Sequence, residues 1–298
     1  MEIADVIKTC HHKEITYQEV YRWGLNELTK ADIADAGLDA RLLLEWCCGT
    51  DRNTLLAHGD REVSGEEVHR YAQCVARRKE HVPLQYITGE QDFMGLVFAV
   101  DKNVLVPRQD TEVLVEEVMR YLHDGMHILD MCTGTGCILL SLLHYSNGCT
   151  GLGVDVSGEA LKVARENAAR TIDAEGRDCV TFVQSDLFDG VDTQEKFDMI
   201  VSNPPYIKTD VIETLMPEVR DYEPHLALDG RQDGLFFYRK IIEQAGEYLA
   251  GGGMLFFEIG FDQGEEVRML MESAGYQEVE IVKDFAGLDR VVHGVHGI

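Results

Sequence analysis

The sequence predicts an α/β protein in which a doubly wound, mostly parallel sheet follows an N-terminal helical bundle and a β-hairpin linker. Three observations support this prediction. Apolar residues recur at helical spacing across residues 1–84, short β-type runs punctuated by glycine occupy 85–106, and strand and helix patterns alternate through 107–298. We therefore expect these three parts, within the one or two domains that a chain of 298 residues allows.

The first region predicts four or five helices. Thr16 is followed three residues later by Glu19, and Ser64 by Glu67, so each pair can form a capping box at the start of a helix. Loop signals that contain glycine separate the apolar runs. No alternation of strands and helices occurs here, so we expect a small helical bundle with the apolar stripes in its core.

The second region predicts short strands. β-forming residues are grouped in three runs separated by turn residues: 85–89, 92–100 and 104–107. We expect these runs to form a β-hairpin linker. The chain then enters a helical pattern, for which Asp110 or Thr111 is the expected N-cap.

The third region predicts the sheet. Strand patterns are expected at 127–131, 151–155, 179–184, 197–202 and 253–259. Helical patterns lie between and after them, at 136–145, 157–170, 234–249 and 262–274. Two further runs, at 279–283 and 289–295, can close the sheet, the last one as an antiparallel strand. Ligands of such sheets bind at the carboxyl ends of the strands.

Composition restricts the function. The chain has 27 basic and 53 acidic residues, a net charge of -26. Proteins that bind nucleic acid draw most of their affinity from Lys and Arg, so we expect no direct nucleic-acid binding, although binding through a local basic patch stays an open alternative.

No apolar stretch is long enough to span a bilayer, and we expect no membrane association. The first eight residues include acidic ones, which neither a signal nor a transit peptide favours, so a cytoplasmic location is expected.

The eight cysteines and eleven histidines predict neither a disulfide framework nor a metal site. No C-x-x-C pair occurs, so we expect reduced and mostly buried thiols. His123 and His127 have the spacing of helical metal ligands, but Gly125 lies between them without an H-E-x-x-H frame. We therefore expect no metal. The cysteines stand at positions 10, 47, 48, 74, 132, 137, 149 and 179.

A glycine loop after the first sheet strand predicts a nucleotide-type cofactor. Gly134 and Gly136 allow a tight turn and a close approach of backbone N–H groups, as either a dinucleotide or an adenosyl cofactor requires. The third glycine of the dinucleotide pattern is absent, because Leu139 holds its place. Asp130 ends the strand, where its carboxylate can contact the amino group of a methionyl moiety. The neighbouring Cys132, Thr133 and Thr135 complete the loop.

Two further aspartates follow the next two strands. Asp155 stands 19 residues after Gly136, where a carboxylate can accept both hydroxyls of a ribose. Asp186 and Leu187 follow the third strand and can hold an adenine by its amino group and its face. Each aspartate alone is as well explained by a helix cap or a loop. Three at successive strand ends favour S-adenosyl-L-methionine, and hence a Rossmann-like class I methyltransferase sheet.

The fourth strand ends in Asn203-Pro204-Pro205-Tyr206, which predicts methyl transfer to a nitrogen. A strand stop explains a proline but not the asparagine and tyrosine. The nitrogen of an amide or aryl amine is a poor nucleophile because its lone pair is delocalised. The side-chain oxygen of Asn203 and the backbone carbonyl of Pro204 can accept hydrogen bonds from its NH2 group and aim the lone pair at the methyl group. Tyr206 can stack on the planar substrate group.

With these motifs and the segments around them, the chain closely resembles the HemK/PrmC family, the peptide chain release factor glutamine N5-methyltransferases. The resemblance covers nearly the whole chain, through segments that begin at Pro83, Phe93, Val104, Val201, Val219, Phe256 and Ala286. It implies methylation of the glutamine amide in the Gly-Gly-Gln motif of class 1 release factors. It also implies that the N-terminal helical domain helps to dock the release factor.

The resemblance further implies roles for individual residues. Cys132–Gly136 and Asp155 would hold the cofactor, with Leu187 on the adenine. Asn203 would touch both cofactor and substrate, and Pro204–Tyr206 the substrate glutamine. Two positions depart from the family pattern: Cys132 stands where glycine is frequent, and Gln109 follows Pro-Arg where proline is usual, which leaves a role for Arg108 open. For Tyr222 and Glu223, which match a family segment near the active site, structural support is expected.

Three other functions are compatible with parts of this pattern. Glutamine methylation of a ribosomal protein uses the same four-residue motif, but the N-terminal region favours a release factor. Adenine N6-methylation of DNA uses a similar motif, and the charge of -26 opposes it. A sensor or inactive scaffold on the same fold would not need an intact Asn203.

Overall fold

The computed structural model describes residues 15–172 and 177–297. The N-terminal residues on which the expected location rests, and Cys10, lie outside these ranges. The seven described cysteines have free thiols, four of them buried: Cys47, Cys74, Cys137 and Cys149. Within the described ranges, no helix has the length and apolar character needed to cross a membrane.

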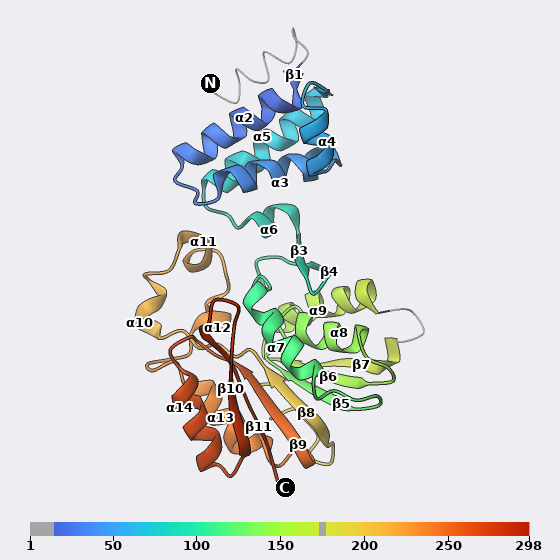
Figure 1. The fold of residues 1–298 in the computed structure, drawn as a ribbon, viewed down its shortest axis with the longest axis vertical. Coiled ribbons are helices and arrows are strands. Elements are labelled where there is room, and N and C mark those ends of the chain that lie inside the picture. The colour runs from blue at the N-terminus through green and yellow to red at the C-terminus, as the bar shows by residue number, and fades with distance from the viewer. Residues whose placement is uncertain (1–14, 173–176, 298) are drawn as a thin grey trace. The chain divides into compact units, whose positions relative to one another are not determined.

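The chain divides into two compact units. A helical unit contains the described residues up to Gly89 together with Pro217–Tyr222, and an α/β unit contains Glu90–Met216 and the chain from Glu223 onward. The helical unit was expected to end at residue 84, and the segment 217–222 was not expected in it. Figure 1 shows the elements of each unit.

The helical unit packs around one apolar core. Both capping boxes are present: the Thr16 hydroxyl accepts from the Glu19 N–H, and the Ser64 hydroxyl from the Glu67 N–H. A short antiparallel pair, β1 (Ile15–Thr16) with β2 (Glu62–Val63), joins the residues before α2 to those before α5 and was not expected from the sequence. The helices are α2 (Tyr17–Lys30), α3 (Ala36–Cys48), α4 (Arg52–Ala57), α5 (Gly65–Lys79), α6 (Leu84–Thr88) and α11 (Pro217–Arg220).

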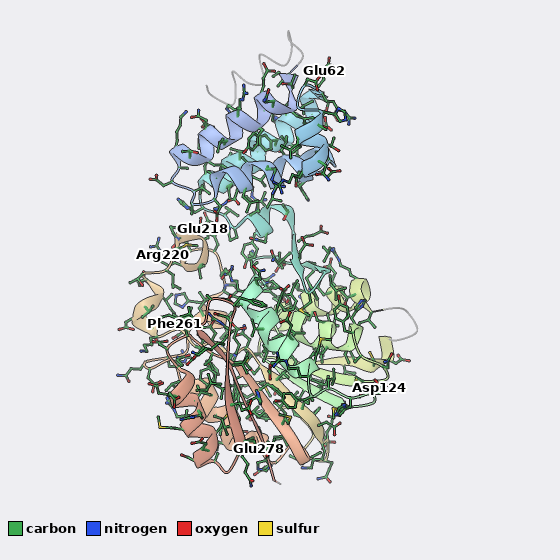
Figure 2. All side chains as sticks on the ribbon, in the orientation of Figure 1. Glu62, Asp124, Glu218, Arg220, Phe261 and Glu278 are labelled. Carbon is green, nitrogen blue, oxygen red and sulfur yellow. The ribbon has the colours of Figure 1, made fainter. Side chains whose placement is uncertain are left out.

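The helix α11 is held to the helical unit by ion pairs. Glu218, labelled in Figure 2, lies 2.9 Å from the Arg78 guanidinium, whose Nε lies 2.7 Å from Asp39. The Tyr222 hydroxyl donates to the Glu80 carbonyl at 2.6 Å. Arg78 and Asp39 are buried, so each charge depends on its partner. The expected structural role of Tyr222 agrees with this contact.

The expected β-hairpin is present but shorter than the run 85–106. It pairs β3 (Glu90–Phe93) with β4 (Leu96–Ala99) through Met94 and Gly95, both with positive φ, as a two-residue hairpin turn requires. Residues 84–88 form the helix α6 and not a strand, since the Tyr86 and Ile87 N–H groups donate to the Pro83 carbonyl and close a helical turn, which Gly89 ends in the left-handed conformation. Asn167 accepts from the Ala99 N–H at 2.6 Å and donates to the Thr135 carbonyl at 3.0 Å. The hairpin is thereby tied to the glycine loop.

The α/β unit contains a seven-stranded sheet in the order β10-β11-β9-β8-β5-β6-β7. Five strands are parallel, and β11 pairs antiparallel with both β9 and β10, as expected for the last strand. Strand order reverses between β5 and β8. The strands are β5 (His127–Met131), β6 (Thr150–Asp155), β7 (Val180–Gln184), β8 (Phe197–Ser202), β9 (Leu249–Glu258), β10 (Gln277–Lys283) and β11 (Asp289–Val295).

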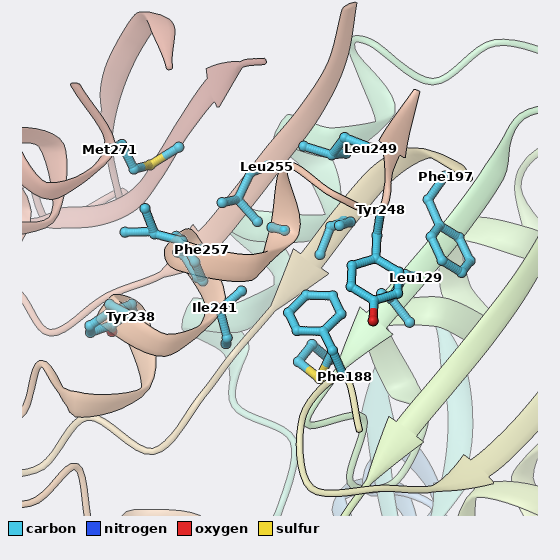
Figure 3. Close-up of a cluster of buried hydrophobic side chains, with 14 of the residues drawn as sticks. Leu129, Phe188, Phe197, Tyr238, Ile241, Tyr248, Leu249, Leu255, Phe257 and Met271 are labelled. Atoms are coloured by element: carbon cyan, nitrogen blue, oxygen red, sulfur yellow. The ribbon is translucent and has the colours of Figure 1, made fainter. Parts of the chain in front are cut away.

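Helices cover both faces of this sheet (Figure 1). One apolar core lies under α7, α8 and α9, and the other under α13 and α14. In the second core, shown in Figure 3, Phe188 stacks on Tyr248 with 4.6 Å between ring centroids. The helices are α7 (Gln109–Met119), α8 (Cys137–His144), α9 (Gly158–Thr171), α10 (Thr209–Ile212), α12 (His225–Leu228), α13 (Phe236–Ala245) and α14 (Gly264–Ser273), with a 3-10 turn at Arg177–Cys179.

Candidate active site

A cavity of about 330 Å³ opens at the carboxyl ends of β5, β6 and β8. Met131 of β5 pairs with Ser202 of β8, so the glycine loop and the Asn-Pro-Pro-Tyr motif leave the sheet side by side. The Ser202 hydroxyl donates to the Met131 carbonyl at 2.6 Å and fixes this junction. The cavity therefore lies where strand order reverses, the usual ligand position in a doubly wound sheet.

The glycine loop forms one wall. Cys132, Thr133, Gly134 and Thr135 line the cavity, whereas Gly136 does not. A Cβ added at Gly134 would meet no atom within 4 Å, so this part of the loop leaves room for a ligand. Cys132 has φ +63°, a conformation that costs a non-glycine residue about 1 kcal/mol and that glycine adopts freely.

Asp130 lies beneath this loop and is not part of the cavity wall. Its side chain is fully buried, and its Oδ2 accepts a hydrogen bond of 2.6 Å from the Thr133 hydroxyl. Its Oδ1 has no hydrogen-bond partner among the residues described. Burial raises the pKa of the Asp130 carboxyl to about 7, although the Thr133 hydrogen bond acts in the opposite direction.

Asp155 holds the loop from the next strand. Its Oδ2 accepts from the Gly134 N–H at 2.9 Å and its Oδ1 from the Ser157 N–H at 2.8 Å. Burial raises the pKa of Asp155, against the lowering effect of these two hydrogen bonds. The carboxylate lines the cavity, and each oxygen keeps a lone pair that a ribose hydroxyl could use.

The two residues expected after the third strand also border the cavity. Asp186 and Leu187 line the cavity at the end of β7. Leu187 has φ +49°, and its carbonyl accepts a hydrogen bond of 2.8 Å from the Ser185 hydroxyl. The structure thus brings Asp155, Asp186 and Leu187 together with the glycine loop around one space.

The Asn-Pro-Pro-Tyr motif is divided between the cavity and the protein interior. Asn203 and Pro205 line the cavity, and the Asn203 Nδ2 donates to the Thr111 hydroxyl at 3.4 Å. Pro204 is buried outside the lining. The Tyr206 hydroxyl donates to Glu258 Oε1 at 3.2 Å, and the Tyr206 carbonyl accepts from Gln263 Nε2 at 3.2 Å. The motif is therefore held at both ends.

Several residues around the cavity were not expected from the sequence. Thr111 was considered only as an N-cap, but α7 begins at Gln109, and Thr111 lines the cavity. Arg108 also lines it and donates to both carboxylate oxygens of Glu223 at 2.6 Å. Burial raises the pKa of Glu223, against the effect of that guanidinium. The periodicity of a helix or strand relates only nearby residues, so it could not have predicted the contact between Arg108 and Glu223, which are 115 positions apart.

The site and the sheet define the class of the protein. A glycine loop after the first parallel strand, a carboxylate after the second, and Asn-Pro-Pro-Tyr after the fourth surround one cavity on a sheet with one antiparallel strand inserted near its edge. This arrangement is that of a class I methyltransferase, whose cofactor is S-adenosylmethionine. The open space at Gly134 and the free lone pairs of Asp155 are compatible with that cofactor.

Comparison with known proteins identifies the family. The family described as PrmC N-terminal domain matches residues 19–89, and the Methyltransferase small domain matches 107–219. The chain is 41% identical to the release factor glutamine methyltransferase of Caulobacter vibrioides over 94% of this chain and 96% of that one. It is 40% identical to the protein of the same name in Clostridium acetobutylicum over 87% and 91%. The chain belongs to the release factor glutamine methyltransferase family.

A solved structure supports the fold. A methyltransferase from Pyrococcus furiosus aligns with a TM-score of 0.51 over 68% of this chain and 90% of its own, at 20% identity. At this level of identity, the likeness bears on the fold alone.

Proposed function

We propose that this protein transfers a methyl group from S-adenosylmethionine to the side-chain amide nitrogen of the glutamine in the Gly-Gly-Gln motif of class 1 release factors. The observation that carries this proposal is the position of Asn203, in the wall of the cavity and beside the glycine loop. Family membership supports the same substrate, because relatives that match nearly the whole chain are named for it.

The cofactor, when bound, supplies an electrophilic methyl group on a sulfonium. Cys132–Gly136 would border it as the loop that leaves room at Gly134, Asp155 would hold it by the ribose hydroxyls, and Asp186 with Leu187 would hold it at the adenine. Asn203 would border both the cofactor and the substrate. Asp130 would act on the amino-acid end through Thr133, its hydrogen-bond partner.

The catalytic residues would act by orienting the substrate amide. The Asn203 side-chain oxygen and the Pro204 carbonyl would accept hydrogen bonds from its NH2 group and direct the lone pair outward. Positive charge develops on this nitrogen during transfer, so both acceptors bind the transition state more strongly than the ground state. Pro205 and Tyr206 would hold the rest of the glutamine side chain, with the Tyr206 hydroxyl fixed by Glu258. The product nitrogen can lose its proton afterwards, so no base is needed beforehand.

The proposed substrate also agrees with the helical unit and the net charge of the chain. The helical unit, most of which falls in the matched PrmC N-terminal domain, would help to dock the release factor. The net charge of -26 favours a protein partner over direct contact with nucleic acid. Release factors work where translation occurs, so a cytoplasmic location follows from the proposed substrate.

The test is a methylation assay with the full chain, S-adenosylmethionine and a purified class 1 release factor, followed by mass spectrometry of the Gly-Gly-Gln peptide. We expect a gain of one methyl group on the glutamine, and a loss of about 100-fold or more in kcat for Asn203→Ala because an acceptor of the transition state is removed. An unmodified glutamine, or methyl transfer to DNA in its place, would refute the proposed substrate. An unchanged kcat in Asn203→Ala would refute the mechanism even with the substrate correct.

A further inference from the structure

A buried amide side chain joins the loop after β9 to two segments that border the cavity. Gln263 is 5% exposed and comes just before α14. Its Nε2 donates to the Tyr206 carbonyl at 3.2 Å and to the Gly234 carbonyl at 3.3 Å. Its Oε1 accepts from the Gly260 N–H at 3.0 Å. Both donors of the amide and its acceptor oxygen are therefore used within the protein.

The two carbonyls belong to different walls of the cavity. Tyr206 ends the Asn-Pro-Pro-Tyr motif, and Gly234 lies in the wall segment (residues 224–237), several of whose residues line the cavity. A Cβ added at Gly234 would lie 2.5 Å from the Tyr206 oxygen and 2.6 Å from Gln263 Nε2. The motif and the wall segment thus meet at a junction that has no room for a larger residue, with the Gln263 amide against both carbonyls.

Backbone hydrogen bonds hold the same two segments together one residue further along. The Ile207 N–H donates to the Leu228 carbonyl at 3.0 Å, and the Gly230 N–H donates to the Ile207 carbonyl at 2.8 Å. These bonds fix the chain that follows the motif. The Gln263 amide, by contrast, fixes the carbonyl of the last residue of the motif itself.

Helix capping does not account for a glutamine at this position. Gln263 is the N-cap of α14, where Ser, Thr, Asp and Asn are preferred because their short side chains accept from the first N–H groups of the helix. In the described chain the Gln263 side chain makes no such bond. Two carbonyls need two donors, and an amide supplies both on one uncharged nitrogen. The contacts of Gln263 therefore point to the motif and not to the helix.

We propose that Gln263 is a positioning residue that holds the Asn-Pro-Pro-Tyr motif against the wall segment and so sets where the Asn203 and Pro204 acceptors lie. The inference rests on the proposed function, since these acceptors would orient the substrate amide. Gln263 is not among the described residues that line the cavity, so it acts through the motif and not on the ligands.

The loss of Gln263 should displace the motif. Two carbonyl oxygens that share no donor repel each other, so without the amide the motif and the wall segment would move apart. A displacement of about half an ångström should lower kcat about 10-fold, since a misplacement of about 1 Å costs about 100-fold. Cofactor and substrate would still bind, because their own contacts are not removed.

The test uses two substitutions of Gln263 in the full chain. Gln263→Glu keeps the shape and an acceptor for the Gly260 N–H but replaces the donor nitrogen with oxygen. Gln263→Met keeps the length without donors or charge. We expect each to lower kcat for release factor methylation about 10-fold or more, with KM and the Kd of the cofactor changed less than about threefold. Rates are measured well below the Tm of each variant, so that unfolding does not contribute.

Two controls separate positioning from a structural role. Gln244→Glu makes the same substitution in the same unit, on α13, where the amide donates to the Lys240 carbonyl, and should leave kcat unchanged. In an Asn203→Ala background, Gln263→Glu should change the single-turnover rate less than about threefold, because one of the acceptors that it positions is already gone. A general loss of structure would act equally in both backgrounds.

The outcomes distinguish this inference from the proposed function. A wild-type protein that does not methylate the release factor would refute the proposed function and the inference with it. An active wild type, with an unchanged kcat in either folded variant of Gln263, would refute the inference alone. The same holds if Gln263→Glu is as damaging in the Asn203→Ala background as in the wild type, or if KM rises as much as kcat falls.

Discussion

Gly230→Ala should slow methyl transfer through a steric effect on the catalytic motif. A Cβ at Gly230 would lie 2.7 Å from the backbone C and Cα atoms of Tyr206 and 2.9 Å from the Cα of Gly234. Ordinary contact begins near 3.4 Å, so the deficit is about 0.7 Å. These neighbours are backbone atoms that cannot rotate away. The Tyr206 carbonyl is also held by Gln263, so the strain must move the motif or its neighbouring loop.

The expected magnitude follows from this deficit. Overpacking of this kind costs about 1–3 kcal/mol, and for a unit of this size Tm should fall by about 2–10 °C. A displacement of about half an ångström at the motif should lower kcat about 10-fold, since a misplacement of about 1 Å costs about 100-fold. Thermal melting and steady-state kinetics with a class 1 release factor measure both effects.

A matched glycine provides the control for this prediction. Gly251→Ala adds a Cβ with no atom within 4 Å, in the same unit and without a left-handed φ, so Tm and kcat should not change. If Gly230→Ala melts at the wild-type temperature with wild-type kcat, the contact between its loop and Tyr206 is not as tight as the distances indicate. The assigned position of the motif would then be wrong.

Three further predictions concern the charged groups around the cavity. Asp155→Asn should raise the Kd of S-adenosylmethionine about 10- to 100-fold in calorimetry, because the ribose hydroxyls lose a charged acceptor. Burial raises the pKa of Asp130 from 3.8 to about 7, so the folded chain holds a proton that the unfolded chain releases between these values. The unfolding free energy therefore falls as pH rises through this window, and Asp130→Asn should remove up to about 4 kcal/mol of that fall in urea titrations. Arg108→Ala and Glu223→Gln should not be additive in stability, with a coupling of about 1 kcal/mol that is limited by the 42% exposure of the Arg108 side chain.

Each of these predictions has an outcome that contradicts it. An unchanged cofactor Kd in Asp155→Asn would remove this carboxylate from the binding site. Identical pH dependence of the unfolding free energy in wild type and Asp130→Asn would show that this carboxyl does not titrate in the window. Additive effects in the double mutant of Arg108 and Glu223 would mean that their ion pair does not stabilise the fold.

Most of the sheet could be predicted from the sequence because its signals are local. The strands 127–131, 197–202 and 289–295 have the expected bounds, since each is an apolar run between turn residues. Both capping boxes are confirmed for the same reason, because each depends on residues three positions apart. The antiparallel direction of the last strand also agrees with its prediction.

Features that depend on long-range contacts could not be predicted. The helix at 84–88 is five residues long, too short for a periodic pattern, and its residues also suit a strand. The pairing of Ile15 with Val63 joins residues far apart in the chain, and so does the contact of Arg78 with Glu218. Neither has a sequence signal of its own, since each is created by the packing of the bundle.

The candidate site shows the same division within a single motif. The sequence predicts substrate contacts for all four residues of Asn203–Tyr206, because strand position and chemistry can be judged only for the motif as a whole. The structure separates Asn203 and Pro205, which line the cavity, from Tyr206, whose hydroxyl is held by a carboxylate 52 positions later. Glu258 ends a strand next to β8, so a search of all strand ends for buried acids would have found it. The motif therefore joins two environments, with Asn203 and Pro205 at the cavity and the Tyr206 hydroxyl against an interior carboxylate, and only the first of these follows from the chemistry of the four residues.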